Sequence, residues 1–248
     1  MPSDGDAFAL ADPPGWRIGA CLSRRNGTCV HRAEHADGRP ALLKRLEGGA
    51  SDPIARLRFE REARLGRLLR HPGLAAPLAS GGDWLLTEWL EPGLAEKHRH
   101  FSSLEQLAPL LAELTQTLGY LHGRGIVHQD VKPAHVLFRG DRAVLVDFGV
   151  AGLVAEDPLA GREAVGAPAW ASPEQLAGAP PAPGADIWSL GRVALWLLGE
   201  AGFDTVPAPL GPLLRRCLDV EPARRPSAAD LFERLRTGSR FAADPSAL

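Results

Sequence analysis

The stretch GIVHQDVKPAHVLF, residues 125–138, is the part of the sequence that decides the fold. It places a carboxylic acid, Asp130, two residues before an amine, Lys132, and its last residues predict a short strand. The lysine stands out because only three of the 28 Lys and Arg residues are lysine, the others being Lys44 and Lys97. A compact ammonium and a planar guanidinium are not interchangeable, so a lysine retained against this bias indicates a chemical role.

Length, charge and hydropathy restrict the class of protein. The 248 residues suffice for one large domain or two small lobes, and a net charge of −2 suggests neither nucleic acid nor an anionic membrane as partner. Residues 193–198, among the longest apolar runs, are too short to span a bilayer, and no signal peptide is evident. We expect a cytoplasmic protein. Cys21, Cys29 and Cys217 lack CxxC spacing, so we expect reduced, buried thiols.

The first part of the chain is rich in predicted strands. Asn26-Gly27 favours a tight type I′ turn between the first two strands. Asp52 and Pro53 are a helix cap and a first-turn proline, and leucines at helical spacing follow. The strands are predicted at residues 16–23, 28–34, 39–46, 74–80 and 83–90, and the helix within residues 51–73.

The second part is mainly helical. Ser102 and Glu105 form a capping-box pattern at the start of a helix that ends at residue 122. Residues 135–138 and 143–148 predict a small hairpin, and residues 150–185 are expected to form loops. Further helices are predicted at residues 185–200, 210–219 and 227–236.

This order predicts an α+β fold with a small strand-rich N-lobe, which contains one helix, and a mainly helical C-lobe. The boundaries are a disordered N-terminal segment at residues 1–14, an N-lobe at 15–91, a C-lobe at 92–240 and a tail at 241–248.

Motifs suited to phosphoryl transfer occur in a fixed order along the chain. ALLK ends at Lys44, FEREA contains Glu62, HQD ends at Asp130 and DFG begins at Asp147. Together, and at these spacings, they make residues 16–236 similar to the eukaryotic-type, Ser/Thr-like protein kinase family, with a composition typical of bacteria. The resemblance implies a bilobal kinase fold that uses ATP with Mg²⁺ or Mn²⁺.

The resemblance assigns nucleotide-binding residues to the N-lobe. Lys44 would grip the ATP phosphates and pair with Glu62, and Val30 would contact the nucleotide. The segment LLTEWL resembles the hinge of the family. The main chain of Glu88 and Leu90 would therefore face adenine.

The resemblance also assigns catalytic and metal-binding residues to the C-lobe. Asp130 would act as the base for the accepting hydroxyl, with Lys132 beside it, and Asp147 would bind metal. His135 stands where the family has an asparagine that binds the second metal. Three alternatives are open: neutral His135 holds a softer metal than Mg²⁺, protonated His135 neutralises phosphate charge, or the ring packs without a role.

The glycine-rich loop and the adenine pocket depart from the family. Its three glycine positions hold Ser23, Arg25 and Thr28, so main-chain N–H groups approach phosphate less closely. Either Arg24 or Arg25 holds phosphate through its side chain, or both are solvated; we assign Arg25 to the nucleotide. Leu42 replaces the usual alanine over adenine and would fill part of the pocket or pack against a shifted base.

Features for control by phosphorylation are missing from the activation segment. Gln129 replaces the arginine that pairs with a phosphate there, and no Ser, Thr or Tyr lies between Phe148 and Ala171. We therefore predict that activity does not depend on phosphorylation of this segment. Ala167 replaces a threonine that, in Ser/Thr-specific members, orients the catalytic Asp and Lys.

Three functions fit the sequence. The first is an atypical protein kinase that transfers the ATP γ-phosphoryl group to a protein hydroxyl, with Ser or Thr favoured; the second is a pseudokinase that binds a regulatory partner. The third is a small-molecule phosphotransferase of the antibiotic-kinase type. Antibiotic kinases lack the set of SPE, Asp186 and Arg225 that this chain shares with protein kinases, which argues against this function. In that set, Asp186 is structural and Arg225 pairs with Glu174.

Overall fold

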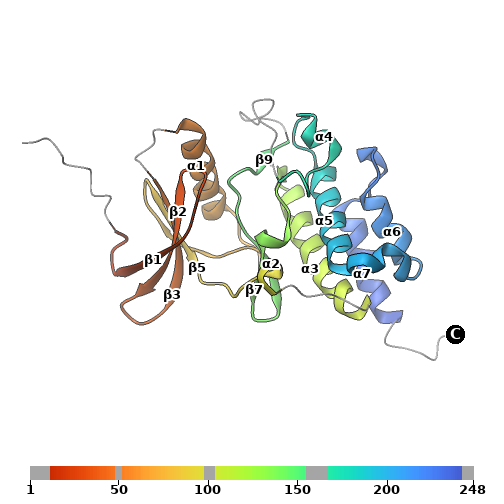
Figure 1. Cartoon of the computed structure of the whole chain (residues 1–248), viewed down its shortest axis with the longest axis horizontal. Helices are drawn as coiled ribbons and strands as arrows, with labels where there is room; N and C mark the ends of the chain where they lie inside the picture. The colour runs from red at the N-terminus through yellow and green to blue at the C-terminus, as the bar shows by residue number, and fades with distance from the viewer. Residues whose placement is uncertain (1–11, 48–51, 98–103, 155–166, 242–248) are drawn as a thin grey trace, which may run out of the picture. The chain divides into compact units, whose positions relative to one another are not determined.

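The chain divides into two units, each with its own core. One comprises residues 1–68 and 76–89, and the other comprises residues 69–75 and 90–248. The first is built on a sheet and the second on helices, which confirms the predicted α+β kinase-like fold (Figure 1). This computed structural model describes residues 12–47, 52–97, 104–154 and 167–241.

Five antiparallel strands form the sheet of the first unit: β1 (Trp16–Arg25), β2 (Thr28–His35), β3 (Pro40–Leu46), β4 (Pro77–Ser80) and β5 (Trp84–Glu88). Their spatial order is β1-β2-β3-β5-β4, so β3 is the central strand. All five predicted strands are present, with ends that differ by a few residues.

The turn between β1 and β2 has the predicted form. Asn26 and Gly27 both have positive φ angles, 50° and 69°, as a type I′ turn requires. A Cβ atom at Gly27 would lie 2.7 Å from the Cβ atom of Ala55, so only glycine fits. Ala55 belongs to α1 (Pro53–Leu68), and Asp52 caps this helix by accepting a hydrogen bond from the main-chain N–H two residues later, at 2.9 Å.

The two faces of the sheet carry different cores, because successive side chains of a strand point to opposite faces. One face packs against α1 through Leu46, Leu85 and Phe59. Lys44 shares this face, since it lies opposite Leu85 in the register of β3 and β5. The other face holds a cluster of Ala33, Ala41, Leu43 and Leu86, with Trp16, Ile18 and Trp84 packed against it.

Two of the three cysteines are joined. Cys21 on β1 and Cys29 on β2 form a disulfide bond, with their Cα atoms 6.4 Å apart. The expectation of reduced, buried thiols is wrong for this pair, and Cys21 is exposed. The pattern of spacings did not reveal the pair because a register shift in β1 places Cys21 opposite His31, on the face of Cys29. Cys217 is a buried free thiol as expected, and burial raises its pKa to about 12.

Helices dominate the second unit: α2 (Leu94–Lys97), α3 (Leu104–His122), α4 (Pro173–Leu176), α5 (Pro183–Leu198), α6 (Leu210–Cys217) and α7 (Ala228–Phe241). The longest, α3, packs against α5 and α7. Its buried leucines recur every three or four residues, as an amphipathic helix requires: Leu107, Leu111, Leu114, Leu118 and Leu121. The predicted cap at Ser102 lies outside the described residues.

Two short strand pairs connect these helices. β7 (Val136–Arg139) pairs with β8 (Arg142–Leu145), which is the predicted hairpin. β6 (Ile126–Val127) pairs with β9 (Gly152–Leu153). The second pair was not predicted, because two residues are too few to show the alternation of a strand.

Two segments differ from the sequence prediction. His135 lies in a 3-10 turn, Pro133–His135, instead of beginning β7, because Pro133 suits the first position of a helical turn. Residues 150–185, predicted as loops, contain α4 and the first turn of α5. A reciprocal capping box between Ser172 and Gln175 starts α4, but four residues are too few to show a helical period.

Asp186, fully buried on α5, fixes the loop that follows β6. Its oxygens accept hydrogen bonds from the main-chain N–H groups of His128 and Gln129, each at 2.8 Å. Nε2 of His122 donates a third bond at 2.8 Å. Gln129 has a φ of 66°, so these bonds hold a left-handed main-chain conformation that few residues adopt. The predicted structural role of Asp186 is confirmed.

Arg225 and Glu174 form the predicted ion pair. Nη1 of Arg225 donates to Oε1 of Glu174 at 2.5 Å, and Nη2 donates to Oε2 at 2.8 Å. Burial acts to raise the pKa of Glu174, but the hydrogen bonds from Arg225, from the main chain and from Ser172, with the charge of Arg225, together hold the pKa below its ordinary value. The guanidinium also lies 5.0 Å from the ring centroid of Trp188. This bidentate contact joins α4 to the segment before α7.

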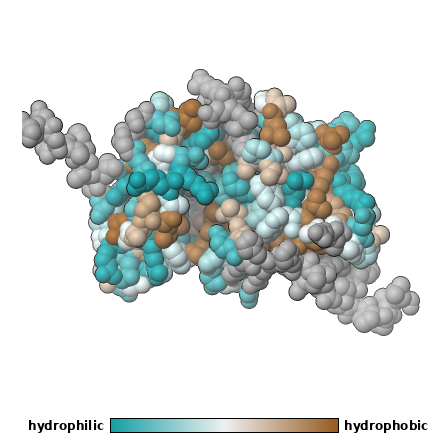
Figure 2. Space-filling model, viewed as in Figure 1, coloured by the Kyte–Doolittle hydropathy of each residue, from teal (hydrophilic) through white to brown (hydrophobic). Residues whose placement is uncertain are grey.

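The helices that the structure describes include none that is both long and apolar enough to cross a bilayer. On the face shown in Figure 2, hydrophilic residues cover much of both units, with hydrophobic residues between them. Exposed large hydrophobic residues include Leu22, Leu68 and Val220. Exposed apolar residues of this kind are common on protein surfaces.

Replacing Asp186 with alanine is expected to destabilise the second unit. The change leaves two buried main-chain N–H groups without acceptors, which costs about 2–5 kcal/mol in the free energy of unfolding. Urea unfolding followed by circular dichroism measures this. Asp141→Ala, at an exposed turn position, is the matched control and should change stability by less than about 0.5 kcal/mol. Equal stability of the two variants would refute the role given to Asp186.

Candidate active site

Lys44 and Glu62 form an ion pair in the first unit. Lys44 Nζ donates to Oε2 of Glu62 at 2.5 Å, and side-chain exposures of 16% and 12% show that the pair is largely shielded from water. Lys44 lies on the central strand β3, and Glu62 lies on α1, which packs on the same face. The predicted pairing is present. Its assignment to the nucleotide phosphates stays a prediction.

Val30 and Leu42 share a sheet face with Lys44. Val30 lies opposite Lys44 in the register of β2 and β3, and partners across strands point to the same face. Leu42 precedes Lys44 by two residues on β3 and therefore points the same way. Both side chains are half-buried. The structure thus brings three residues predicted to bind the nucleotide onto one face, where the leucine adds volume that an alanine would not.

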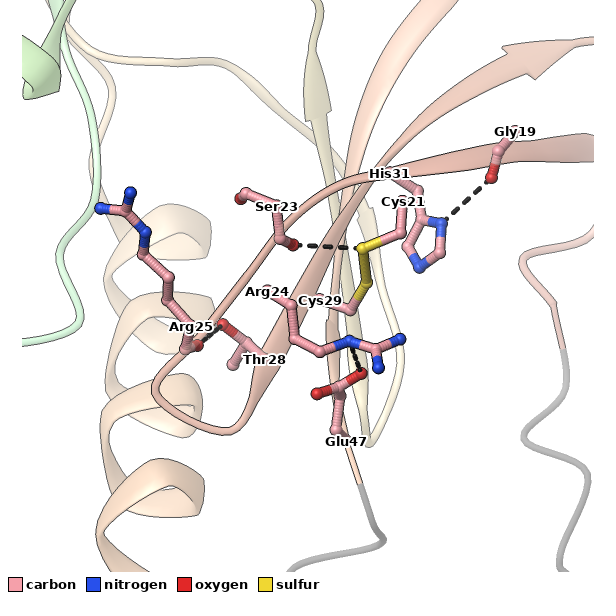
Figure 3. Close-up of a disulfide and its surroundings, with 9 residues drawn as sticks. All are labelled: Gly19, Cys21, Ser23, Arg24, Arg25, Thr28, Cys29, His31 and Glu47. Atoms are coloured by element: carbon pink, nitrogen blue, oxygen red, sulfur yellow. Dashed lines mark hydrogen bonds and ion pairs between the residues drawn. A yellow bond between two sulfur atoms is a disulfide. The ribbon is translucent and has the colours of Figure 1, made fainter.

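The two arginines before the turn between β1 and β2 differ in their contacts: Arg24 is in an ion pair, and Arg25 is exposed. Nε of Arg24 forms an ion pair with Oε1 of Glu47 at 2.7 Å. The Arg25 side chain is exposed and extends away from the hairpin in Figure 3. Its main-chain oxygen accepts a hydrogen bond from Oγ1 of Thr28 at 3.0 Å, which tightens the turn. Of the two arginines, Arg25 is therefore the better candidate for a phosphate.

Glu88 ends the sheet through main-chain and side-chain bonds. Its N–H donates to the oxygen of Ala76 at 2.9 Å, and the N–H of Ala76 donates to Oε1 of Glu88 at 2.6 Å. The main-chain N–H of Glu88 is therefore engaged within the first unit. Leu90, the other predicted hinge residue, is nearly buried and belongs to the second unit. Both assignments stay predictions.

Asp130 is oriented through both of its carboxylate oxygens. Oδ1 accepts a hydrogen bond from the main-chain N–H of Ala167 at 3.1 Å, and Oδ2 accepts one from Nζ of Lys132 at 2.6 Å. Its side chain is 11% exposed and that of Lys132 is 21% exposed. A carboxylate fixed in this way beside an ammonium group can accept the proton of a hydroxyl or orient it.

His128 packs at the centre of the site and takes no part in its surface. It is fully buried, and its ring centroid lies 5.2 Å from that of Phe148. Nε2 lies 3.2 Å from the oxygen of Val146, which can only accept, so Nε2 carries the ring proton. Nδ1 then accepts the N–H of Asp130 at 3.3 Å. His128 is therefore a residue of the core.

Gln129 ties the same loop to the chain after Asp147. Its Nε2 donates to the main-chain oxygen of Val150 at 2.8 Å. Its own main-chain oxygen accepts Nε2 of Gln175 at 3.0 Å. The residue that replaces a phosphate-binding arginine thus forms neutral hydrogen bonds, which need no phosphate to complete them.

Asp147 and His135 face each other. Asp147 has a φ of 69° and is 39% exposed, and its Oδ1 accepts the N–H of Gly149 at 3.2 Å. Nδ1 of His135 lies 2.9 Å from the main-chain oxygen of Asp130, which can only accept, so Nδ1 carries the ring proton. Nε2 then presents its lone pair to Oδ2 of Asp147 at 3.5 Å.

This arrangement of two acceptors suits a cation. Ligand atoms about 2.1 Å from one ion can lie up to about 4.2 Å apart, so 3.5 Å is a distance that one ion can span. Burial lowers the pKa of His135, and the carboxylates of Asp147 and Asp130 raise it only in part. A lowered pKa favours the neutral ring, and with it the alternative of metal binding over that of a protonated histidine on phosphate.

The sequence interpretation missed two functional contacts. The N–H of Ala167 replaces the hydroxyl of the threonine that the family resemblance led us to expect. Gln175 braces the loop through Gln129. A main-chain donor has no side-chain signature, so no residue pattern could have indicated the first contact.

Most of the chain is similar to known protein kinases. Residues 25–205 match the family described as Protein kinase domain. The serine/threonine-protein kinase AfsK of Streptomyces coelicolor is 31% identical over an alignment of 236 positions, which takes in 83% of this chain and 30% of that protein. PkaA of the same organism is 33% identical over an alignment of 272 positions, which takes in 94% of this chain and 50% of that protein. PAK mbt of Drosophila melanogaster is 29% identical over an alignment of 219 positions, which takes in 85% of this chain and 34% of that protein. The chain thus spans half or less of the length of these relatives.

Replacing His135 with asparagine is expected to shift metal preference from Mn²⁺ towards Mg²⁺. The change exchanges a nitrogen ligand for an oxygen ligand, and Mg²⁺ has the stronger preference for oxygen. Competition between Mg²⁺ and Mn²⁺, followed by the electron paramagnetic resonance signal of free Mn²⁺ in the presence of ATP, measures the ratio of affinities. His35→Asn, on β2, is the control. An unchanged ratio in His135→Asn would contradict metal ligation by this histidine.

Proposed function

Because the chain belongs to the protein kinase family, we propose that it is an active, atypical protein kinase that transfers the γ-phosphoryl group of ATP to a protein hydroxyl, with Ser or Thr favoured. One observation carries this proposal: Asp130 is held at both oxygens although the threonine of the family is absent. In Ser/Thr-specific members that threonine orients the catalytic Asp and Lys, and here the main-chain N–H of Ala167 donates to Asp130 instead.

The roles of the residues follow from their contacts. ATP supplies the γ-phosphoryl group, and a divalent cation, Mg²⁺ or Mn²⁺, neutralises part of its charge. Lys44 is shielded and fixed by Glu62, so its ammonium group is available to phosphate in one position. Lys132 lies against Asp130 and can compensate charge on the transferred group. Asp130 orients the accepting hydroxyl and receives its proton.

A pseudokinase that binds a regulatory partner is the second candidate. The observation that favours it is Leu42, which adds side-chain volume on the face that carries Lys44 and Val30. The glycine positions of the loop hold larger residues as well, and the proposed phosphate contact is left to Arg25. Overpacking of this kind typically costs about 1–3 kcal/mol, which weakens nucleotide binding without necessarily abolishing it.

Binding of ATP with Mn²⁺ or Mg²⁺ is expected to raise the melting temperature of the wild-type chain. A ligand at 100 times its dissociation constant stabilises by about 2.7 kcal/mol, which for this size is roughly 5–10 °C. The same preparation should transfer ³²P from ATP to itself or to a generic acceptor such as casein. Lys44→Met should lower the transfer rate by at least about 100-fold.

Two further variants separate the candidates. Lys97→Met is the matched control for Lys44→Met, since it removes a lysine that is not assigned to the site, and it should retain full activity. Asp130→Asn should retain the thermal shift and lose transfer, because it keeps the shape of the side chain and removes the proton acceptor. A shift without any transfer in the wild type, or no shift with either metal, would select the pseudokinase instead.

Activity is expected to be unchanged after treatment with a broad-specificity protein phosphatase. The segment between Phe148 and Ala171 has no hydroxyl side chain. The start of this segment is held by an uncharged hydrogen bond from the Gln129 side chain to the main-chain oxygen of Val150. Initial transfer rates before and after treatment, with phosphate removal verified by mass spectrometry, give the measurement. A large loss of rate would show that a phosphate elsewhere in the chain controls the enzyme.

A further inference from the structure

Three metal-binding side chains meet on the β1–β2 hairpin, outside the candidate active site. The sulfur atoms of Cys21 and Cys29 and a ring nitrogen of His31 lie within 4.8 Å of one another. Figure 3 shows the two sulfurs joined and the His31 ring beside them. Cys29 is buried, His31 is half-buried and Cys21 is exposed, so the cluster opens to solvent on the side of β1.

The register of the hairpin explains why these three side chains converge. Cys29 and His31 are two residues apart on β2, so they point to the same face of the sheet. Cys21 lies directly opposite His31, and cross-strand partners share a face. The register shift between Cys21 and Ser23 leaves the exposed Leu22 as an extra residue on β1. It thereby places Cys21 on the same face as Cys29.

The hydrogen bond of His31 orients the ring as a metal ligand. Nδ1 lies 3.1 Å from the main-chain oxygen of Gly19. A carbonyl oxygen can only accept, so Nδ1 carries the proton and Nε2 keeps its lone pair. In Figure 3 this second nitrogen lies on the side of the two sulfurs. Histidines that bind metals in proteins are held in this way, through a hydrogen bond from the other ring nitrogen.

We propose that the reduced hairpin binds one Zn²⁺ ion through Cys21, Cys29 and His31. Two thiolates and one imidazole are a ligand set that zinc prefers, and a water molecule on the exposed side completes four ligands. Two external thiols, or one dithiol, first reduce the S–S bond by supplying two electrons and two protons, and are themselves oxidised to a disulfide. Zn²⁺ then displaces the two thiol protons to solvent. The disulfide in the structure is thus the metal-free, oxidised form of the same centre.

Charge around the hairpin does not oppose this ion. Two thiolates cancel the double positive charge of Zn²⁺, so the bound centre is neutral beside the neighbouring arginines. Arg24, opposite Cys29 in the register, is in addition paired with Glu47 at 2.7 Å. A neutral centre avoids the cost of placing an unpaired charge beside the buried Cys29.

The zinc site is separate from the proposed nucleotide site. Val30, which lies between Cys29 and His31 on β2, points to the opposite face and is paired with Lys44. The ion would therefore join β1 to β2 just before the Asn26-Gly27 turn without occupying the face of Lys44. Zinc binding in this position can be tested without nucleotide, so it stands or falls independently of phosphoryl transfer.

The test uses Co²⁺ as a spectroscopic probe for Zn²⁺. The full chain is reduced with a phosphine, freed of metal and reductant under anaerobic conditions, and titrated with Co²⁺. We expect saturation at one equivalent, with thiolate-to-cobalt charge-transfer absorption and the visible bands of a tetrahedral ion, and loss of both when Zn²⁺ is added. Protein with the disulfide intact should give neither band.

Two variants avoid the buried Cys29, whose replacement could prevent folding. Cys21→Ser should lose the charge-transfer absorption of the native site, and His31→Gln should weaken Zn²⁺ binding by more than about 10-fold, since even the loss of an outer hydrogen-bond partner costs about 10–100-fold. Cys217→Ser is the matched control and should bind like the wild type. Circular dichroism without metal verifies folding. Reduced wild type that binds no ion, or unchanged affinity in His31→Gln, would overturn the proposal.

Discussion

The hydrogen bonds from a main-chain loop to the buried carboxylate of Asp186 are the constraint on which the candidate site depends. They fix His128 and the left-handed Gln129 immediately before Asp130. Beside this fixed main chain, the side chain of Asp130 accepts a hydrogen bond from Lys132. The buried carboxylate of Asp186 is stabilised because each of its oxygens accepts a hydrogen bond from a main-chain N–H that would otherwise lack a partner. The position of the loop that carries Asp130 therefore depends on the buried carboxylate of Asp186.

Around that constraint, other groups replace those that the family resemblance led us to expect. The N–H of Ala167 takes the place of a threonine hydroxyl on Asp130, and the amide of Gln129 takes the place of a charged arginine. A main-chain donor cannot rotate away, so it orients a carboxylate at least as firmly as a hydroxyl does. A neutral amide needs no counter-charge, so it holds Val150 without a phosphate. These exchanges are consistent with a site ordered by its own fold rather than by modification.

The sequence predicted those features that local chemistry determines, and missed those that depend on distant segments. The type I′ turn followed from Asn26-Gly27, and the start of α1 followed from Asp52, because each is decided by adjacent residues. The N–H of Ala167 and the pairing of Cys21 with Cys29 each join segments through tertiary structure or a register shift, which residue types do not reveal. The roles of the motif residues came from a resemblance, and the contacts between them give those roles a physical basis.

His135, which stands where the family has an asparagine, changes the type of ligand atom beside Asp147. An asparagine oxygen and a neutral imidazole nitrogen carry the same net charge, so the substitution leaves the charge of the ligand set with Asp147 unchanged. It changes only the type of donor atom, from hard oxygen to softer nitrogen. Because Coulomb attraction to Asp147 persists while the geometry keeps Nε2 and Oδ2 3.5 Å apart, the site retains its attraction for a cation. In the proposed metal site, the substitution would therefore alter the choice of metal rather than the charge of the ligand set.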